Sequence, residues 1–77
     1  MTSKKIYYTS HARRRLQRRG ILKESVETVL ISPDLKLPAM NKKRKRWAKQ
    51  FGDKFLHVIF EERPNRIDII TAQWPEE

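Results

Sequence analysis

The stretch that decides the fold runs from residue 9 to residue 21 and reads Thr9-Ser10-His11-Ala12-Arg13-Arg14-Arg15-Leu16-Gln17-Arg18-Arg19-Gly20-Ile21. Thr9 or Ser10 can begin a helix here, because either hydroxyl can accept a hydrogen bond from an unpaired backbone N–H. Gly20 can end it, because glycine readily adopts the left-handed conformation that closes a helix. The sequence therefore predicts a first helix between these two signals.

As a helix, this stretch aligns a histidine with several arginines. At about 100° per residue, one sector of roughly 100° contains His11, Arg15, Arg18 and Arg19. Ala12 and Leu16 continue that sector into an apolar edge, which predicts a small buried side next to a cationic one. A solvated basic helix, in which the arginines serve only solubility, would show the same pattern.

A second helix is predicted directly after Gly20. Leu22, Val26, Val29 and Leu30 recur at helical spacing. This helix must end near Ser32, because Pro33 disfavours helical geometry in the preceding residue. Its start has no capping signal, since Leu22 occupies the position where serine, threonine or aspartate is usual.

From Asp34 onward, the apolar residues alternate or form short runs, which indicates strands. With a β-prone segment at the N-terminus, the expected strands cover residues 4–8, 35–37, 46–51, 55–60 and 66–72. Gly52-Asp53 and residues 61–65 supply turns between the later strands. These features predict an α+β fold, in which two N-terminal helices pack on one face of a small antiparallel β-sheet, as one domain over residues 1–77.

Charge is strongly uneven along the 77 residues. The net charge is +9, of which residues 1–50 contribute +12 and residues 51–77 contribute −3. A concentrated positive field of this kind favours binding of RNA or DNA, with affinity that falls steeply with salt. The same field would attract an acidic protein.

Composition also argues against several other classes. The chain has no cysteine, which excludes disulfides and suits a reducing, cytoplasmic location. No apolar stretch approaches the roughly 20 residues that span a bilayer, so we expect no membrane partner. Two histidines without cysteine or clustered carboxylates argue against zinc and two-metal sites, so we expect no metal and no cofactor.

The pattern His-Ala-x-x-Arg-x-x-x-Arg-Gly-Ile, present from His11 to Ile21, resembles that of a family of small bacterial and archaeal proteins of unassigned function. The valine- and leucine-rich second helix and the closing Ile-Ile-Thr segment extend the resemblance over nearly the whole chain. That family in turn resembles the RelE/ParE toxin superfamily. The resemblance implies two N-terminal helices on a compact antiparallel sheet, and a toxin encoded beside an antitoxin. RelE-like members cut RNA without a metal, whereas ParE-like members act on DNA gyrase.

Metal-free RNA cleavage requires a base for the 2′-hydroxyl proton, a cation for the phosphorane and an acid for the leaving 5′-oxygen. His11 lies at a helix N-terminus, where free N–H groups favour a phosphate. We therefore expect His11 to act as the base, with Arg15 and Arg19 as phosphate clamps. Alternatively, His11 only caps the helix or bonds a sheet carbonyl.

The second histidine, His57, shares a strand face with Phe55 and Ile59, because alternate residues point the same way. On its own this pattern is typical of a half-buried structural histidine. If the face opens onto the cationic edge of the first helix, His57 could instead be a second acid or base. The sequence does not decide between the two.

A basic run at residues 42–46 precedes Trp47, and basic residues beside an aromatic ring suit a single-stranded backbone with one base stacked on the ring. Alternatively, the lysines protect a sheet edge and Trp47 is part of the core. Trp74 is expected to close one end of the core. The expected nucleic-acid-binding residues are Arg14, Arg18, Lys43, Arg44, Lys45, Arg46 and Trp47.

Taken together, these features predict a toxin-like protein that binds RNA, possessing a metal-independent endoribonuclease activity of the mRNA interferase type and acting on free or ribosome-associated RNA. One alternative is a noncatalytic module or toxin that docks on an acidic antitoxin or on gyrase. Another is a plain nucleic-acid-binding protein.

Overall fold

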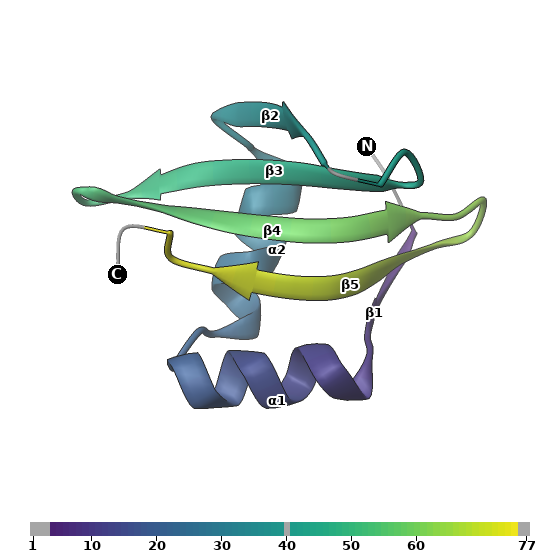
Figure 1. The fold of residues 1–77 in the computed structure, drawn as a ribbon, viewed down its shortest axis with the longest axis horizontal. Coiled ribbons are helices and arrows are strands. Elements are labelled where there is room, and N and C mark those ends of the chain that lie inside the picture. Colours follow the sequence, from purple (N-terminus) through teal and green to yellow (C-terminus); the bar gives the residue numbers. More distant parts are fainter. Residues whose placement is uncertain (1–3, 40, 76–77) are drawn as a thin grey trace.

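The computed structural model describes residues 4–39 and 41–75 and contains two helices beside one five-stranded sheet (Figure 1). In chain order the elements are β1 (Lys5–Tyr8), α1 (Ser10–Arg19), α2 (Lys23–Ile31), β2 (Leu35–Pro38), β3 (Arg44–Phe51), β4 (Lys54–Glu62) and β5 (Arg66–Gln73). The fold is therefore α+β, and every predicted helix and strand is present with similar bounds.

The sheet has the strand order β1-β5-β4-β3-β2 and is mixed rather than purely antiparallel. Strands β2 to β5 pair antiparallel, but β1 runs parallel to β5, with Ile6 opposite Ile67 and Tyr8 opposite Ile69. The expectation of an antiparallel sheet is therefore wrong at this edge. Short turns force β3, β4 and β5 to alternate in direction, whereas β1 connects to the later strands through both helices and is free to pair in parallel.

The helix ends follow the local signals. The Thr9 hydroxyl accepts a hydrogen bond from the Ala12 backbone N–H at 3.0 Å and so caps α1. Gly20 closes α1 with φ 66° and ψ 33°, in the left-handed region that favours glycine. Leu22 precedes α2 without a side-chain capping bond. Of the two cap candidates for the first helix, Thr9 is the one that bonds, and α2 ends at Ile31, next to the predicted end near Ser32.

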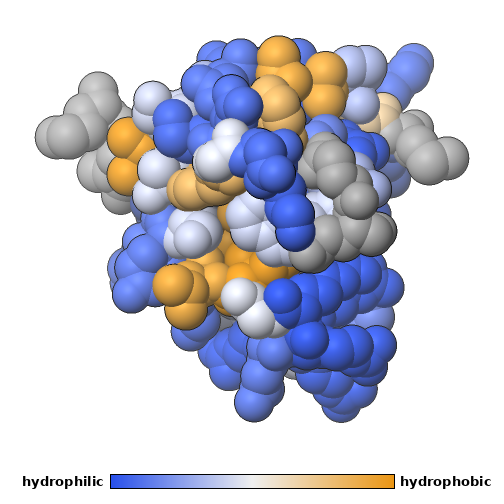
Figure 2. Space-filling view, turned by 90° about the vertical axis from the view of Figure 1, so that its left-hand side faces the viewer, coloured by the Kyte–Doolittle hydropathy of each residue, from blue (hydrophilic) through white to orange (hydrophobic). Residues whose placement is uncertain are grey.

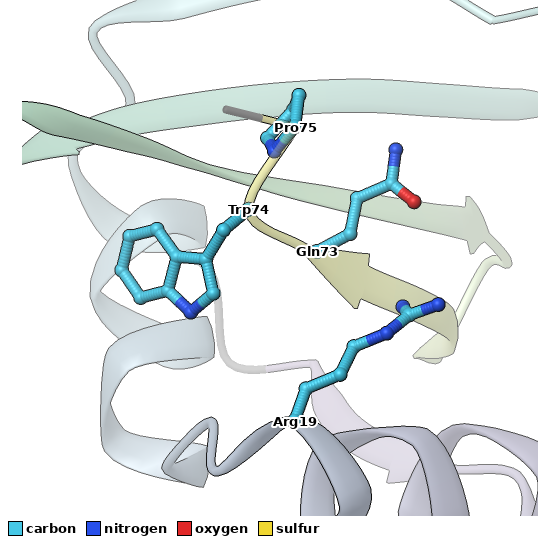
Figure 3. Close-up of a pocket in the computed structure, with 4 residues that line it drawn as sticks. All are labelled: Arg19, Gln73, Trp74 and Pro75. Atoms are coloured by element: carbon cyan, nitrogen blue, oxygen red, sulfur yellow. The ribbon is translucent and has the colours of Figure 1, made fainter. Parts of the chain in front are cut away.

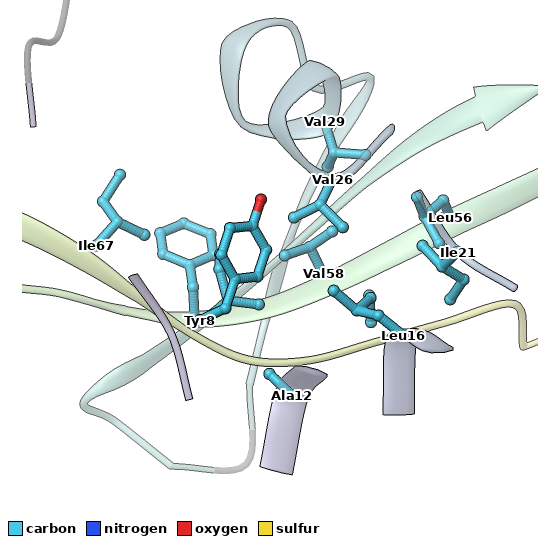
Figure 4. Close-up of a cluster of buried hydrophobic side chains, with 12 residues drawn as sticks. Tyr8, Ala12, Leu16, Ile21, Val26, Val29, Leu56, Val58 and Ile67 are labelled. Atoms are coloured by element: carbon cyan, nitrogen blue, oxygen red, sulfur yellow. The ribbon is translucent and has the colours of Figure 1, made fainter. Parts of the chain in front are cut away.

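The core lies between the helices and one face of the sheet, and α2 crosses behind β3 and β4 in Figure 1. Figure 4 shows the buried side chains from α1, α2, β4 and β5 converging there. The Tyr8 hydroxyl points toward α2 and donates a hydrogen bond to Glu27 Oε2 at 3.0 Å. Burial, together with this bond, raises the pKa of Tyr8 well above its ordinary range, so the hydroxyl stays protonated. Trp74 packs edge-on against Phe51, their ring centroids 6.0 Å apart, at the border of this core.

The second half of β5 is flanked by helix α1 on the side where its first half pairs with β1. β1 ends opposite Ile69, so the remainder of β5 has no strand on that side. Helix α1 packs against β5 instead and lies along it in Figure 1. Backbone groups on this side of β5 beyond Ile69 therefore need hydrogen-bond partners other than β1.

The other face of the sheet carries no helix and faces the viewer in Figure 1. We call it the open face; its central residues are Arg46, His57, Ile59, Thr71 and Gln73, which the strand register places on the same side. Within residues 4–39 and 41–75, neither helix has the length and apolar character needed to cross a bilayer.

Candidate anion-binding site on the open face

Two arginines of α1 reach across to the free side of β5. Arg15 Nη1 and Arg19 Nη1 donate long hydrogen bonds, 3.4 and 3.3 Å, to the Thr71 hydroxyl. Arg19 Nη1 also donates to the Ala72 carbonyl at 2.7 Å, which supplies this edge of β5 with the partner that β1 does not provide. Both guanidinium groups are therefore held at the border of the open face.

A third arginine is held by a histidine. Arg46 Nε, on β3, donates to His57 Nδ1, on β4, at 2.8 Å. Because a guanidinium has no acceptor, Nδ1 must carry the lone pair, and the neutral imidazole then has its proton on Nε2. The His57 side chain thus lies on the open face beside a cation, and its role as a second acid or base stays a prediction.

The strand register brings these two groups of side chains together. Ile59 on β4 lies opposite both Arg46 on β3 and Thr71 on β5. His57, two residues earlier, lies opposite Gln73. Thr71, which holds the α1 arginines, and Arg46 therefore lie on either side of Ile59. Their strands, β5 and β3, are two strand spacings apart, roughly 10 Å.

We call Arg15, Arg19 and Arg46 the arginine belt. Among the described residues, none of the three forms an ion pair, and their acceptors are a hydroxyl, a carbonyl and a neutral imidazole. Their positive charge is therefore fixed in position but not neutralised. Such an arrangement binds anions, because a planar guanidinium matches the geometry of phosphate or carboxylate oxygens.

Other arginines of the same face are neutralised. Arg63 Nε donates to Asp68 Oδ2 at 2.7 Å, and Arg44 Nε donates to Glu61 Oε2 at 3.2 Å. Asp68 is only 6% exposed, and its Oδ1 lies 2.8 Å from Arg66 Nε in an ion-pair contact whose angle does not make a hydrogen bond. Among the described residues, the belt arginines therefore differ from Arg44 and Arg63 in having no carboxylate partner.

The remaining predicted residues of α1 are exposed to solvent. The side chains of His11, Arg14 and Arg18 make no hydrogen bond or ion pair with any residue between 4–39 or 41–75. Thr9, not His11, caps the helix, so His11 has neither of the structural roles considered as alternatives. Figure 2 shows the surface at the level of α1 as largely hydrophilic, next to a smaller apolar patch.

The basic run before Trp47 is divided between the two faces of the sheet. Arg44 and Arg46 lie on the open face, whereas Lys45 and Trp47 point to the helix side. Trp47 packs edge-on against Phe60 with ring centroids 5.0 Å apart. Lys43 precedes β3 and is exposed. The structure therefore does not bring Trp47 together with the belt, and the ring is part of the core border.

Two residues of the site were not singled out from the sequence. Thr71 anchors both α1 arginines, and the only signal for it was a polar residue within an apolar strand. Gln73 stands opposite His57, and nothing in the local pattern marked it. Both residues lie on β5, and Thr71 is more than 50 residues away from Arg15 and Arg19 in the sequence. Their closeness to α1 therefore depends on how the sheet is paired.

A pocket of about 450 Å³ opens beside the belt and is lined by Arg19, Gln73, Trp74 and Pro75 (Figure 3). A second, apolar hollow of about 240 Å³ lies on the helix side between α2, β1 and β4. Within the described part of the chain, no three His, Asp or Glu side chains gather closely enough to hold a metal ion.

Comparison with known proteins adds one match. The family model for the Domain of unknown function (DUF4258) covers residues 8–74, which include both helices, the arginine belt, His57 and Gln73. Searches of curated proteins and of solved structures gave no match. Because the matched range spans most of its length, the chain belongs to the DUF4258 family of domains of unknown function.

Proposed function

We propose that this protein binds single-stranded RNA on its open face, with Arg15, Arg19 and Arg46 contacting the phosphates. The observation that carries the proposal is the charge state of the belt: three guanidinium groups are anchored by neutral acceptors and have no carboxylate partner among the described residues. Anchored side chains lose little further freedom when they bind, and their free N–H groups can be shared with phosphate oxygens.

The extent of the belt supports a polymer rather than a single small anion. Arg46 comes from β3, and the α1 arginines are held at Thr71 on β5, two strand spacings away, so one phosphate does not contact all of them. Exposed Arg14 and Arg18 extend the positive surface along α1. The choice of RNA, and the RelE-like relationship that we include in this proposal, come from the sequence resemblance.

The test is binding of a short labelled RNA, followed by fluorescence anisotropy, with single-stranded DNA of the same sequence in parallel. We expect Arg15→Ala and Arg46→Ala each to weaken RNA binding about 10-fold, the loss of one charge-assisted hydrogen bond. Arg13→Ala is the matched control, because Arg13 is exposed on the same helix but lines a hollow toward α2. Equal losses for Arg13→Ala and Arg15→Ala would contradict the proposal, since they would show a response to charge alone.

We further propose that the bound strand is cleaved without a metal. His11 is the base, because it is exposed one helical turn before Arg15 and makes no competing hydrogen bond to a described residue. The 2′-oxygen bonds to phosphorus, its proton passes to His11, and Arg15 and Arg19 stabilise the phosphorane. The bond to the 5′-oxygen then breaks, and solvent protonates that oxygen.

The structure argues against assigning the acid to His57. A doubly protonated His57 would have no lone pair on Nδ1 and would lose the hydrogen bond from Arg46. We therefore give His57 a positioning role, in which it holds Arg46 on the open face.

Cleavage is tested with labelled RNA in EDTA, with ribosomes present and absent, comparing the native protein with His11→Ala and with Arg13→Ala. We expect fragments with 2′,3′-cyclic phosphate ends from the native protein and from Arg13→Ala, and a loss of at least 100-fold in His11→Ala. Full activity in His11→Ala would remove His11 from the mechanism. Binding without any cleavage would leave the RNA-binding function and remove the ribonuclease step.

A further inference from the structure

The pocket lined by Arg19, Gln73, Trp74 and Pro75 lies directly beside the belt, because Arg19 belongs to both. Its volume of about 450 Å³ falls within the range of small-molecule sites, whereas a bare phosphate would leave most of it empty. The pocket can therefore accept a larger group that is attached to a phosphate bound at the belt.

The groups lining the pocket are flat or have unused hydrogen-bonding atoms. Neither the Gln73 amide nor the Trp74 indole N–H bonds to another described residue. The hydrogen bonds from the Arg19 side chain to described residues are donated by Nη1. The lining thus offers an aromatic ring, an amide that both donates and accepts, and spare guanidinium donors.

The side chains are also arranged around the end of β5. Figure 3 shows the Trp74 ring on one side of the strand end and the Arg19 guanidinium and Gln73 amide on the other. Edge-on packing against Phe51 holds the ring in place. A planar ligand that lies over the end of β5 can then contact the indole on one side and polar atoms of Arg19 or Gln73 on the other.

We propose that this pocket takes one unstacked nucleobase of the bound RNA strand. The inference rests on the proposed function, because the phosphate next to that base is the one held at Arg15 and Arg19. A nucleobase supplies what the pocket lacks: a flat apolar surface for the indole, and edge donors and acceptors for the Gln73 amide. Binding of RNA therefore includes a base contact as well as phosphate contacts.

The experiment compares a short RNA with a ribose-phosphate strand of equal length that carries no bases. We expect the native protein to bind the RNA about 10-fold more tightly than the abasic strand, the usual contribution of a base against an aromatic side chain. Gln73→Ala and Trp74→Leu should each lower this ratio toward one. Gln17→Ala, which removes an exposed amide from the far side of α1, should leave the ratio unchanged.

Because Trp74 borders the core, thermal unfolding is recorded for each variant. The Gln73 side chain bonds to no described residue, so Gln73→Ala is expected to fold. Gln73→Ala alone provides the test if Trp74→Leu does not fold. Equal native affinities for RNA and the abasic strand would overturn the base pocket while leaving phosphate binding intact. An unchanged ratio in Gln73→Ala would also overturn it. Failure of both strands to bind would overturn the proposed function together with this inference.

Discussion

A single hydroxyl, that of Thr71, organises two of the three belt arginines. Thr71 is 5% exposed and lies where β1 leaves one side of β5 free, and its hydroxyl accepts from both Arg15 and Arg19. Arg15 has no other acceptor among the described residues, whereas Arg19 also bonds the Ala72 carbonyl. Thr71 is therefore the residue through which the sheet determines the position of Arg15.

Thr71→Val removes this acceptor and keeps the shape of the side chain. Because both hydrogen bonds are long and both guanidinium groups can turn to water, we expect the free energy of unfolding to change by less than about 1 kcal/mol. RNA affinity should fall about threefold, since Arg15 must be ordered on binding. Anisotropy and urea unfolding measure the two effects. Unchanged RNA affinity would show that the hydroxyl does not position Arg15.

At this scale the sequence was informative only along α1. Helical periodicity was sufficient to place Arg15 and Arg19 beside Ala12 and Leu16, because the spacing of residues on one helix is fixed. The same reasoning could not find Thr71 or Gln73, since their proximity to α1 depends on how β5 pairs with β1 and β4. It also could not show that Arg46 bonds His57, which requires the register of β3 against β4.

Among the elements, α1 is joined to the sheet at its N-cap residue, Thr9. The Thr9 hydroxyl accepts from the Ala12 N–H and donates to the Ile69 carbonyl at 3.2 Å. One side chain therefore both caps the helix and satisfies a carbonyl of β5. This junction fixes the start of α1 on the sheet and so helps to position the arginines further along the helix.

Thr9→Ala should lower the free energy of unfolding by about 1 to 2 kcal/mol, because it removes an N-cap and leaves the Ile69 carbonyl without this donor. Urea unfolding measures the loss. Thr28→Ala is the control, since the exposed Thr28 hydroxyl donates only to Glu24 within α2. A loss in Thr28→Ala as large as that in Thr9→Ala would contradict the role of this junction.

The Glu62 carboxylate, at the end of β4, bonds to lysines from two distant segments, Lys4 before β1 and Lys45 on β3. Hydrogen bonds from Lys4 at 2.8 Å and from Lys45 at 2.6 Å lower the pKa of Glu62 from 4.5 to about 2. The depressed value means that the stabilising effect is fully present above about pH 4.5 and is lost as pH falls through about 2. The side chain is 36% exposed, so screening reduces the effect to less than about 1 kcal/mol.

We therefore expect Glu62→Gln to lose stability at pH 7 and to show a shallower fall in stability between pH 4.5 and pH 2 than the native protein. Thermal unfolding across this range provides the measurement. Parallel pH profiles for the two proteins would mean that Glu62 titrates alike in the folded and unfolded chain. Asp53→Asn, at the exposed turn between β3 and β4, serves as the control.

The elements themselves were predictable because their signals are local. Thr9, Gly20 and Pro33 each act within a few residues, and the alternation of the later strands follows from their own sequence. The direction of β1 was not predictable in this way. Its neighbour lies about 60 residues away, and two helices separate it from the other strands, so no turn determines how it pairs.

Two interpretations of the basic run of β3 were open, and the structure agrees with the second at Trp47, whose ring packs against the core. Treated as one surface, residues 42–46 and Trp47 would form a single nucleic-acid-binding patch. Because side chains alternate along a strand, Arg46 lies on the open face as part of the belt, while Trp47 packs on Phe60 on the helix side. Strand alternation therefore matters more here than closeness in sequence.

For the whole molecule, the effect of the net charge of +9 on RNA affinity must be distinguished from the effect of contacts at the belt. Affinity for single-stranded RNA should fall with salt, and each phosphate contact contributes a slope of about −0.7 in log K against log salt. Arg46→Ala should make that slope shallower by about this amount. A slope that remains unchanged in Arg46→Ala would show that Arg46 contacts no phosphate.

The most direct measurement of the central claim is an NMR titration of the native protein with single-stranded RNA, observing the arginine Nε–H groups and the backbone amides. Binding at the belt predicts shifts at the side chains of Arg15, Arg19 and Arg46 and at the amides of Thr71 and Gln73. Arg63, already paired with Asp68, should stay unchanged. Shifts at Arg63 or along α2, with the belt unaffected, would contradict the claim that the open face is the RNA-binding surface.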